Sequence, residues 1–283
     1  MRLSVESGVM KGLSHKERLL RIKEAGFDAV DFSFFGLEGE NARLLGDGYI
    51  ECAAELREYM DGIGIVCNQA HAPFEMTAED PISEECDKYL RLTRSIEAAA
   101  ILGAPYIVVH CIRTEQKQLP ERNREFYTSL LPYAERAGIK IAVENLFGAP
   151  NEQGVRDGYF ADPKEHIDFV RSLGSPYFNI CIDLGHSALT GRRPEDVIRE
   201  MDPDLFELIH LHDNDYVDDM HRIPFSGKFD WRAICDALVA IGYRGDMSLE
   251  LIGHFNALPP ATHEAALRYA ERIGRELIGM CGK

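Results

Sequence analysis

Short apolar runs that each end in an acidic or histidine side chain recur through the second half of the chain. Four of these runs close at Glu144, Asp183, His212 and Glu250. A short apolar run bounded by turn residues is typical of a parallel strand that is buried on both faces. A carboxylate or imidazole at the end of such a strand is costly to bury unless it is paired or binds a metal. The recurrence therefore predicts one polar site that successive strands build together.

Strand patterns and amphipathic helix patterns alternate along all 283 residues. The expected strands are Leu3–Glu6, Ala29–Phe34, Ile65–Gln69, Tyr106–His110, Lys140–Leu146, Asn179–Asp183, Leu208–His212 and Met247–Leu251. The expected helices are Ser14–Ala25, Tyr49–Gly62, Ser83–Leu102, Arg122–Ala137, Asp162–Leu173, Pro194–Met201, Trp231–Ile241 and Ala261–Met280. Eight units of about 35 residues have the size of a (β/α)8 barrel.

The alternative α/β architecture is a doubly wound open sheet. That fold usually carries a glycine-rich turn after its first strand, and the segment Ser7–Gly12 does not match this fingerprint. No linker or low-complexity stretch divides the chain. We therefore predict a single (β/α)8 TIM barrel domain over residues 1–283.

The charge balance argues against a polyanionic partner. The chain has 47 acidic and 31 basic residues, a net charge of −16, and no basic run, so no nucleic acid partner is expected. No apolar run reaches the roughly 18 residues of a membrane span, and the first residues do not form a signal peptide pattern. The seven cysteines form no CxxC pair, which fits reduced side chains in the cytoplasm.

In a barrel of this kind the active site lies at the carboxyl ends of the strands. Three carboxylates with one imidazole suit a divalent metal such as Mn²⁺, Mg²⁺, Co²⁺ or Zn²⁺, and a network of structural salt bridges is the alternative. Alternation along the strand places His210 and His212 on the same face. His212 lies nearer the strand end and is the expected ligand, whereas His210 is either a core histidine or a group that supports the ligands.

Several motifs together resemble those of the xylose isomerase-like TIM barrels, which include sugar-phosphate isomerases and epimerases, ketose 3-epimerases and endonuclease IV. The motifs are Val143–Asn145, Asp183–His186, His210–Asp215, and Gly242–Gly245 followed by Glu250. The resemblance covers nearly the whole chain. It implies one divalent metal, a small carbohydrate substrate, and isomerisation or epimerisation through a metal-stabilised enediolate. The residues at the metal positions are Glu144, Asp183, His212 and Glu250.

The resemblance also assigns roles around the metal. Glu144 and Glu250 would exchange protons with a substrate carbon, and His186 would contact the substrate. A hydride shift between two carbons is a competing mechanism. Further substrate contacts are expected from His71, His110, Asn145 and Arg222.

Two other kinds of enzyme, a nuclease and a dehydratase, resemble the chain in the same motifs. The positions that hold three zinc ions in endonuclease IV are matched here, which would add a second or third metal and phosphodiester hydrolysis. The additional ligands would be His71, His110, Asp219 and His221. The net charge and the absence of Ser-Lys after Asp213 argue against the nuclease. Dehydratases of inosose type are the other alternative.

The sequence does not specify the sugar. Ketose 3-epimerases carry an arginine and a glutamate where this chain has Asp218 and Pro150, so no particular ketose is assigned. Arg113 and Arg222 are candidates for binding a substrate phosphate. The oligomeric state is left open, with a homo-oligomer as one possibility.

Overall fold

The computed structural model describes residues 1–35, 39–112, 120–152 and 156–282. Eight parallel strands close into a barrel in the order β1-β10-β9-β8-β5-β4-β3-β2, with β1 pairing to β2. The barrel strands are β1 (Leu3–Glu6), β2 (Ala29–Ser33), β3 (Val66–His71), β4 (Tyr106–Val109), β5 (Lys140–Glu144), β8 (Phe178–Asp183), β9 (Phe206–Leu211) and β10 (Met247–Leu249). The predicted (β/α)8 barrel is confirmed.

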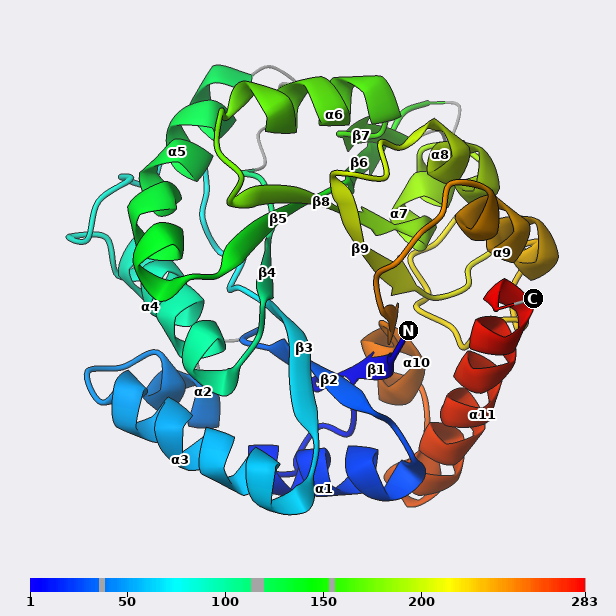
Figure 1. Cartoon of the computed structure of the whole chain (residues 1–283), viewed down its shortest axis with the longest axis horizontal. Helices are drawn as coiled ribbons and strands as arrows, with labels where there is room; N and C mark the ends of the chain where they lie inside the picture. Colours follow the sequence, from blue (N-terminus) through cyan, green and yellow to red (C-terminus); the bar gives the residue numbers. More distant parts are fainter. Residues whose placement is uncertain (36–38, 113–119, 153–155, 283) are drawn as a thin grey trace.

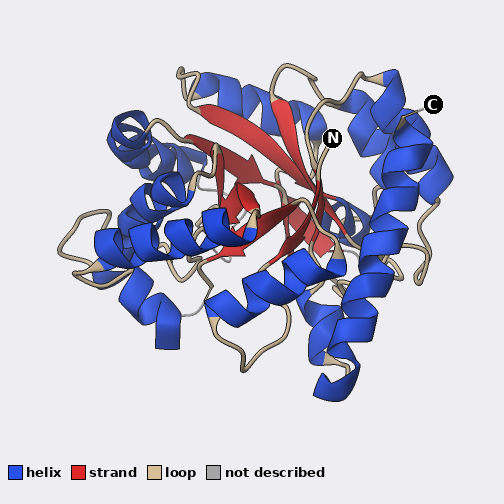
Figure 2. Ribbon diagram, turned by 60° about the horizontal axis from the view of Figure 1, so that its bottom comes forward, coloured by secondary structure: helices blue, strands red, loops and turns tan. Residues whose placement is uncertain are grey.

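Helices form a ring outside the strands (Figures 1 and 2). They are α1 (His15–Ala25), α2 (Gly39–Leu44), α3 (Tyr49–Ile63), α4 (Asp87–Leu102), α5 (Pro120–Ala137), α6 (Pro163–Ser172), α7 (Leu184–Leu189), α8 (Pro194–Glu200), α9 (Trp231–Ala240), α10 (Ile252–Asn256), a 3₁₀ turn (Pro260–Thr262) and α11 (His263–Cys281). Among the described residues, no helix is both long enough and apolar enough to cross a membrane.

Local sequence signals fix where the helices begin. Ser14 and Glu17 form a capping box at the start of α1, in which each side chain bonds the other residue's backbone N–H. Asp162 accepts hydrogen bonds from the backbone of Lys164 and Glu165 at the start of α6, directly before Pro163. These are the helix starts that the sequence predicted at Ser14 and Asp162.

Two layers of apolar packing hold the barrel in shape. The larger cluster joins the strands to the surrounding helices. A small separate cluster, Val108, Ala142, Cys181 and Leu208, comes from four adjacent strands. Because side chains alternate along a strand, the residues two positions further on, such as Glu144 after Ala142 and Asp183 after Cys181, share this inner face. Apolar packing in the barrel thus supports the polar side chains at the carboxyl ends of the strands.

The predicted strand over Lys140–Leu146 was too long. β5 ends at Glu144, and Leu146 belongs to a two-stranded hairpin of β6 (Leu146–Pro150) and β7 (Arg156–Tyr159). The helices α2, α7 and α10 were also not predicted. They have only five or six residues, too few for a helical period to be recognised in the sequence.

Candidate active site

The structure brings the four predicted metal ligands to the same end of the barrel. Glu144 ends β5, Asp183 ends β8, and His212 and Glu250 each lie just after a strand, β9 and β10. All four are buried. Their ligand atoms do not all lie within 4.8 Å of one another, but they are linked in pairs that do. These pairs are Glu144 with Asp183, Glu144 with Glu250, and His212 with Glu250.

Asp183 organises one side of this cluster. Its two carboxylate oxygens lie 3.1 and 3.0 Å from Nε2 of His212. Oδ1 also accepts a 2.6 Å hydrogen bond from the backbone N–H of His186, because Asp183 is the N-cap of α7. Asn145 holds the same segment through hydrogen bonds to the backbone N–H and carbonyl of Asp183. The Asn145 amide thus joins β5 to β8, a positioning role that the prediction of substrate contact did not include.

His210 lies between the two predicted catalytic glutamates. Its Nδ1 is 3.0 Å from Oε1 of Glu144 and 3.2 Å from Oε2 of Glu250. Its Nε2 is 2.9 Å from Nε2 of Gln69, which also donates to Asp31. Since the Gln69 amide nitrogen can only donate, Nε2 of His210 accepts and Nδ1–H faces the glutamates. His210 was expected to be either a core histidine or a group that supports the metal ligands, and its contacts with the glutamates fit the second role.

The two glutamates differ in their electrostatic surroundings. Burial by itself would raise the pKa of Glu144, but His210 and His110 outweigh it and hold that pKa well below the usual value. Nε2 of His110 lies 2.8 Å from Glu144 Oε2. Burial raises the pKa of Glu250 well above its usual value, and the neighbouring carboxylates of Glu144 and Asp183 raise it further.

This donor set fits a divalent cation. His212 Nδ1 is buried and has no hydrogen-bond partner among the described residues, and the buried Glu250 Oε2 lies 3.2 Å from His210 Nδ1 without forming a hydrogen bond with it. A cation would offset the repulsion between the carboxylates, and oxygen donors with an imidazole match the preferences of Mn²⁺, Co²⁺, Mg²⁺ or Zn²⁺. The same cluster therefore has both the unpaired donor atoms and the excess negative charge that a metal would satisfy.

A second donor group adjoins the first. Asp219 Oδ2 lies 3.1 Å from His221 Nε2 and 3.9 Å from His186 Nε2. The His221 ring stacks on that of His212 with centroids 4.0 Å apart. His221 has a φ of 45°, which is uncommon for a residue other than glycine and marks a position held by its surroundings. The predicted additional ligands Asp219 and His221 thus lie beside the main site.

His71 and Arg222 occupy different settings. His71 is buried, and its Nδ1 is 2.9 Å from Oδ1 of Asp31. Arg222 pairs with Asp213 through two backbone hydrogen bonds, 2.8 and 3.0 Å long, and is not among the described residues that line the cavity. The substrate contacts predicted for both residues rest on the sequence alone. Arg113 lies outside the described residues.

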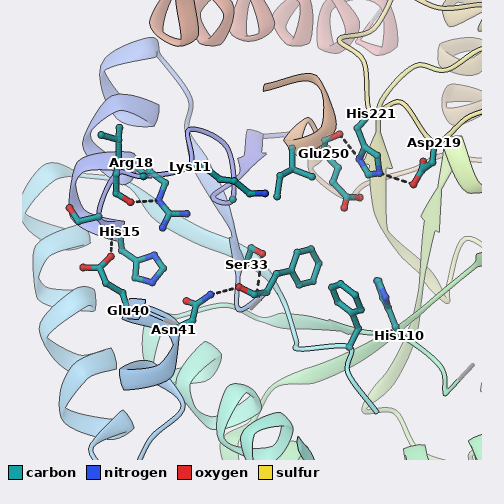
Figure 3. A pocket seen from close by; sticks show the side chains of 18 of the residues that line it. Lys11, His15, Arg18, Ser33, Glu40, Asn41, His110, Asp219, His221 and Glu250 are labelled. Atoms are coloured by element: carbon teal, nitrogen blue, oxygen red, sulfur yellow. Dashed lines mark hydrogen bonds and ion pairs between the residues drawn. The ribbon is translucent and has the colours of Figure 1, made fainter. Parts of the chain in front are cut away.

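A cavity of about 920 Å³ opens over these groups (Figure 3). Of the predicted site residues, five line the cavity, whereas Glu144, Asp183 and His212 are buried and are not among its described lining residues. The five are His110, His186, Asp219, His221 and Glu250. His186 directs Nδ1 to the carbonyl of Asn145 at 2.9 Å, so its Nε2 is available to the cavity.

Burial and nearby carboxylates shift the pKa of His71 in opposite directions, and the net shift can be measured. Burial lowers its pKa, but Asp31 and other carboxylates outweigh burial and raise the pKa to about 9. Because this folded-state pKa lies above the ordinary 6.5, the pairing stabilises the fold below pH 6.5 and is lost as pH rises through about 9. We expect the NMR titration of His71 in metal-free protein to have a midpoint near 9, and Asp31→Asn to lower it by more than a unit.

The buried His166 is an internal control for this measurement. Burial lowers the pKa of His166 to about 3, so its signals should not move between pH 5 and 9. An unchanged His71 midpoint in Asp31→Asn would contradict the assigned pairing.

Comparison with known proteins places this architecture in one family. Residues 19–275 match the family model described as xylose isomerase-like TIM barrel. The putative L-ribulose-5-phosphate 3-epimerase SgbU of Escherichia coli is 26% identical over 261 residues, which cover 87% of this chain and 86% of that protein.

Solved structures show the same fold. D-psicose 3-epimerase of Clostridium cellulolyticum, determined with D-tagatose, superposes with a TM-score of 0.76 at 16% identity, covering 98% of this chain and 99% of that one. The IolI protein, determined with a bound zinc atom, superposes with a TM-score of 0.76 at 18% identity, covering 99% and 98%. Because the family model matches most of the sequence, the chain belongs to the xylose isomerase-like TIM barrel family.

Proposed function

We propose that this protein is a divalent-metal-dependent epimerase or isomerase of a sugar or sugar phosphate. The observation that carries the proposal is the convergence of Glu144, Asp183, His212 and Glu250 at the carboxyl ends of four strands, where Glu250 lines the cavity. The family membership and the sugar epimerases among the similar proteins support the choice of substrate.

The residues divide the chemistry as follows. A divalent cation, when bound by these four residues, would polarise the substrate carbonyl and stabilise the negative charge that develops beside it. Glu250, which lines the cavity, and the neighbouring Glu144 move a proton away from and back to carbon. His186 donates to the Asn145 carbonyl through Nδ1 and accepts a hydrogen bond from a substrate hydroxyl through Nε2. His210 positions Glu144 through the hydrogen bond that its Nδ1–H donates, and the same nitrogen lies 3.2 Å from Glu250.

The test is epimerisation of a panel of ketoses in D₂O with added Mn²⁺, Co²⁺, Mg²⁺ or Zn²⁺. Proton transfer predicts a new epimer or isomer that carries deuterium at the reacting carbon. Product without deuterium would indicate a hydride shift instead. Loss of water from an inosose substrate, without isomerisation of any ketose, would favour the dehydratase.

Metal removal should destabilise the protein, because a ligand that binds only the folded state stabilises it. At a metal concentration 1,000 times Kd the stabilisation is about 4 kcal/mol. We expect chelation to lower the melting temperature and abolish turnover, and one equivalent of metal to restore both. An unchanged melting temperature after complete removal, confirmed by elemental analysis, would contradict the metal site.

A second candidate function is supported by the second group of donors, which consists of His186, Asp219 and His221. A site with additional metals would suit phosphodiester hydrolysis, as the similarity of His71, His110, Asp219 and His221 to endonuclease IV ligands implies. The net charge of −16 opposes binding to DNA. Binding of three ions together with efficient, chelator-sensitive nicking of a duplex with an abasic site would favour the nuclease.

A further inference from the structure

The cavity extends well beyond the metal cluster. Its other end is built by the loop after β1, the start of α1 and the start of α2, and is lined by Lys11, His15, Arg18, Glu40 and Asn41. Figure 3 shows these side chains on one side of the cavity and Glu250, His221, Asp219 and His110 on the other. At about 920 Å³ the cavity is near the upper limit for sites that hold drug-sized molecules. A substrate therefore has room to reach both ends.

Two positively charged side chains, Arg18 and Lys11, line this second end of the cavity. Arg18 donates through Nε to the carbonyl of Leu13 and through Nη1 to that of Ser7, each at 3.0 Å. These bonds fix the plane of the guanidinium and leave other N–H donors for a ligand. Lys11 is exposed, its side chain extends into the cavity in Figure 3, and no carboxylate among the described residues forms an ion pair with it.

A buried imidazole adds an independent indication of a ligand. His15 is 5% exposed, lines the cavity, and has no hydrogen-bond partner for either ring nitrogen among the described residues. Asn41 lies beside it, but its buried Oδ1 is also without a well-aligned partner. Burial lowers the pKa of His15 to about 4, so the neutral ring offers one donor and one acceptor at pH 7. Buried polar atoms normally find partners, and a ligand would supply them.

The charge at this end is positive on balance. Glu40 is the acidic residue among the described lining residues there, and its Oε2 already accepts a 2.5 Å hydrogen bond from the backbone N–H of His15. Lys11 and Arg18 outnumber it among the described lining residues, and burial raises the pKa of Glu6, the other carboxyl group near Arg18, which disfavours its negative charge. A local positive end in an acidic protein attracts a small anion, whereas the carboxylates at the metal end repel one.

Building on the proposed function, we propose that Lys11 and Arg18 bind an anionic group at the far end of the sugar chain while the carbonyl end lies at the metal cluster. The natural substrate is then a ketose that carries a terminal phosphate or carboxylate. Phosphate and carboxylate share the oxygen acceptors that a guanidinium and an ammonium recognise. Neutral ketoses lack this contact and are poorer substrates.

The test compares kcat/KM for matched substrates: D-fructose, D-fructose 6-phosphate and D-fructuronate, with the ribulose and tagatose pairs in parallel. A hydrogen bond to a charged group is worth about 1.5–3 kcal/mol, a factor of roughly 10–100 in specificity. We expect the anionic member of a pair to be preferred by at least this factor. The phosphate and carboxylate arms identify which anion the site accepts.

Lys11→Gln should reduce the preference for the anionic substrate about 10-fold or more. Lys16→Gln is the matched control, because Lys16 is a nearby lysine in the first turn of α1, packs over the Tyr59 ring and is not among the described residues that line this cavity. It should leave the preference unchanged. Equal kcat/KM for charged and neutral ketoses, together with no effect of Lys11→Gln, would overturn the inference and leave the epimerase proposal intact.

Binding to chelator-treated protein separates this inference from the proposed function. D-Fructose 6-phosphate or D-fructuronate should raise the melting temperature of the metal-free protein more than D-fructose does, and Lys11→Gln with Arg18→Gln should remove the difference. This result would support the anion site even if no ketose were turned over, an outcome that would contradict only the proposed reaction. Equal melting shifts for the anionic and neutral sugars would count against the anion site.

Discussion

Replacing either Glu144 or Glu250 by glutamine is expected to lower kcat for ketose epimerisation by about 10²–10⁴-fold, the usual contribution of a proton-transfer group. Glutamine has nearly the shape of glutamate but cannot take a proton from carbon. The loss should appear equally in the exchange of the substrate C–H proton with D₂O. Metal binding should weaken in both variants but be partly retained, since three other ligands and one amide oxygen remain.

Stability measurements show whether the variants are folded. Glu250 is buried among carboxylates that raise its pKa, so its ionisation at neutral pH opposes folding of the metal-free protein. Glu250→Gln should therefore melt no lower than the wild type without metal. Glu207→Gln is a matched control, because Glu207 pairs with Lys140 near the opposite end of the barrel and should not affect turnover. Exchange at the wild-type rate in either active-site variant would disprove the two-glutamate mechanism.

The second large effect is expected from Gly185→Ala. A Cβ atom at Gly185 would overlap Cε1 and Nε2 of His212, so the imidazole that contacts Asp183 would have to shift. Overpacking of this kind costs about 1–3 kcal/mol. Disturbing the support of a metal ligand typically lowers affinity about 10–100-fold. Isothermal titration with Mn²⁺ or Zn²⁺ and assay of turnover at saturating metal would measure both consequences.

Gly62→Ala provides the control for the change of residue type. Gly62 lies within α3, and a Cβ there would meet no atom within 4 Å. Alanine is a better helix former than glycine, so this variant should be stabilised by roughly 0.5–1 kcal/mol with unchanged metal affinity. Wild-type metal affinity in Gly185→Ala would show that the His212 position is not required for binding.

The strand positions could be predicted because a strand that is buried on both faces has a continuous run of apolar residues in the sequence. Runs such as Ile141–Val143 and Ile180–Ile182 are apolar throughout, and a polar residue at their ends stands out. The same pattern located Glu144 and Asp183 at one end of the barrel. Strand lengths were less certain, as Leu146 shows, because the local pattern does not distinguish a barrel strand from the hairpin that follows it.

Other residues that line the cavity have no distinctive sequence pattern around them. Lys11 and Arg18 resemble ordinary surface residues of a loop and a helix in the sequence, and only the closure of the barrel places them on the cavity that Glu250 lines. Asp213, which also ends a strand pattern, instead anchors a loop by accepting hydrogen bonds from Phe229 N–H and Trp231 Nε1.

By itself, the sequence determined the barrel and predicted that polar side chains, among them four candidate metal ligands, gather at the carboxyl ends of its strands, because alternation and burial are properties of each strand. The tertiary structure decided the contacts between strands: His210 between two glutamates, Asp183 against His212, and Lys11 and Arg18 across the cavity from Glu250. These contacts join residues far apart in the chain, and their distances and charges arise only when the barrel closes.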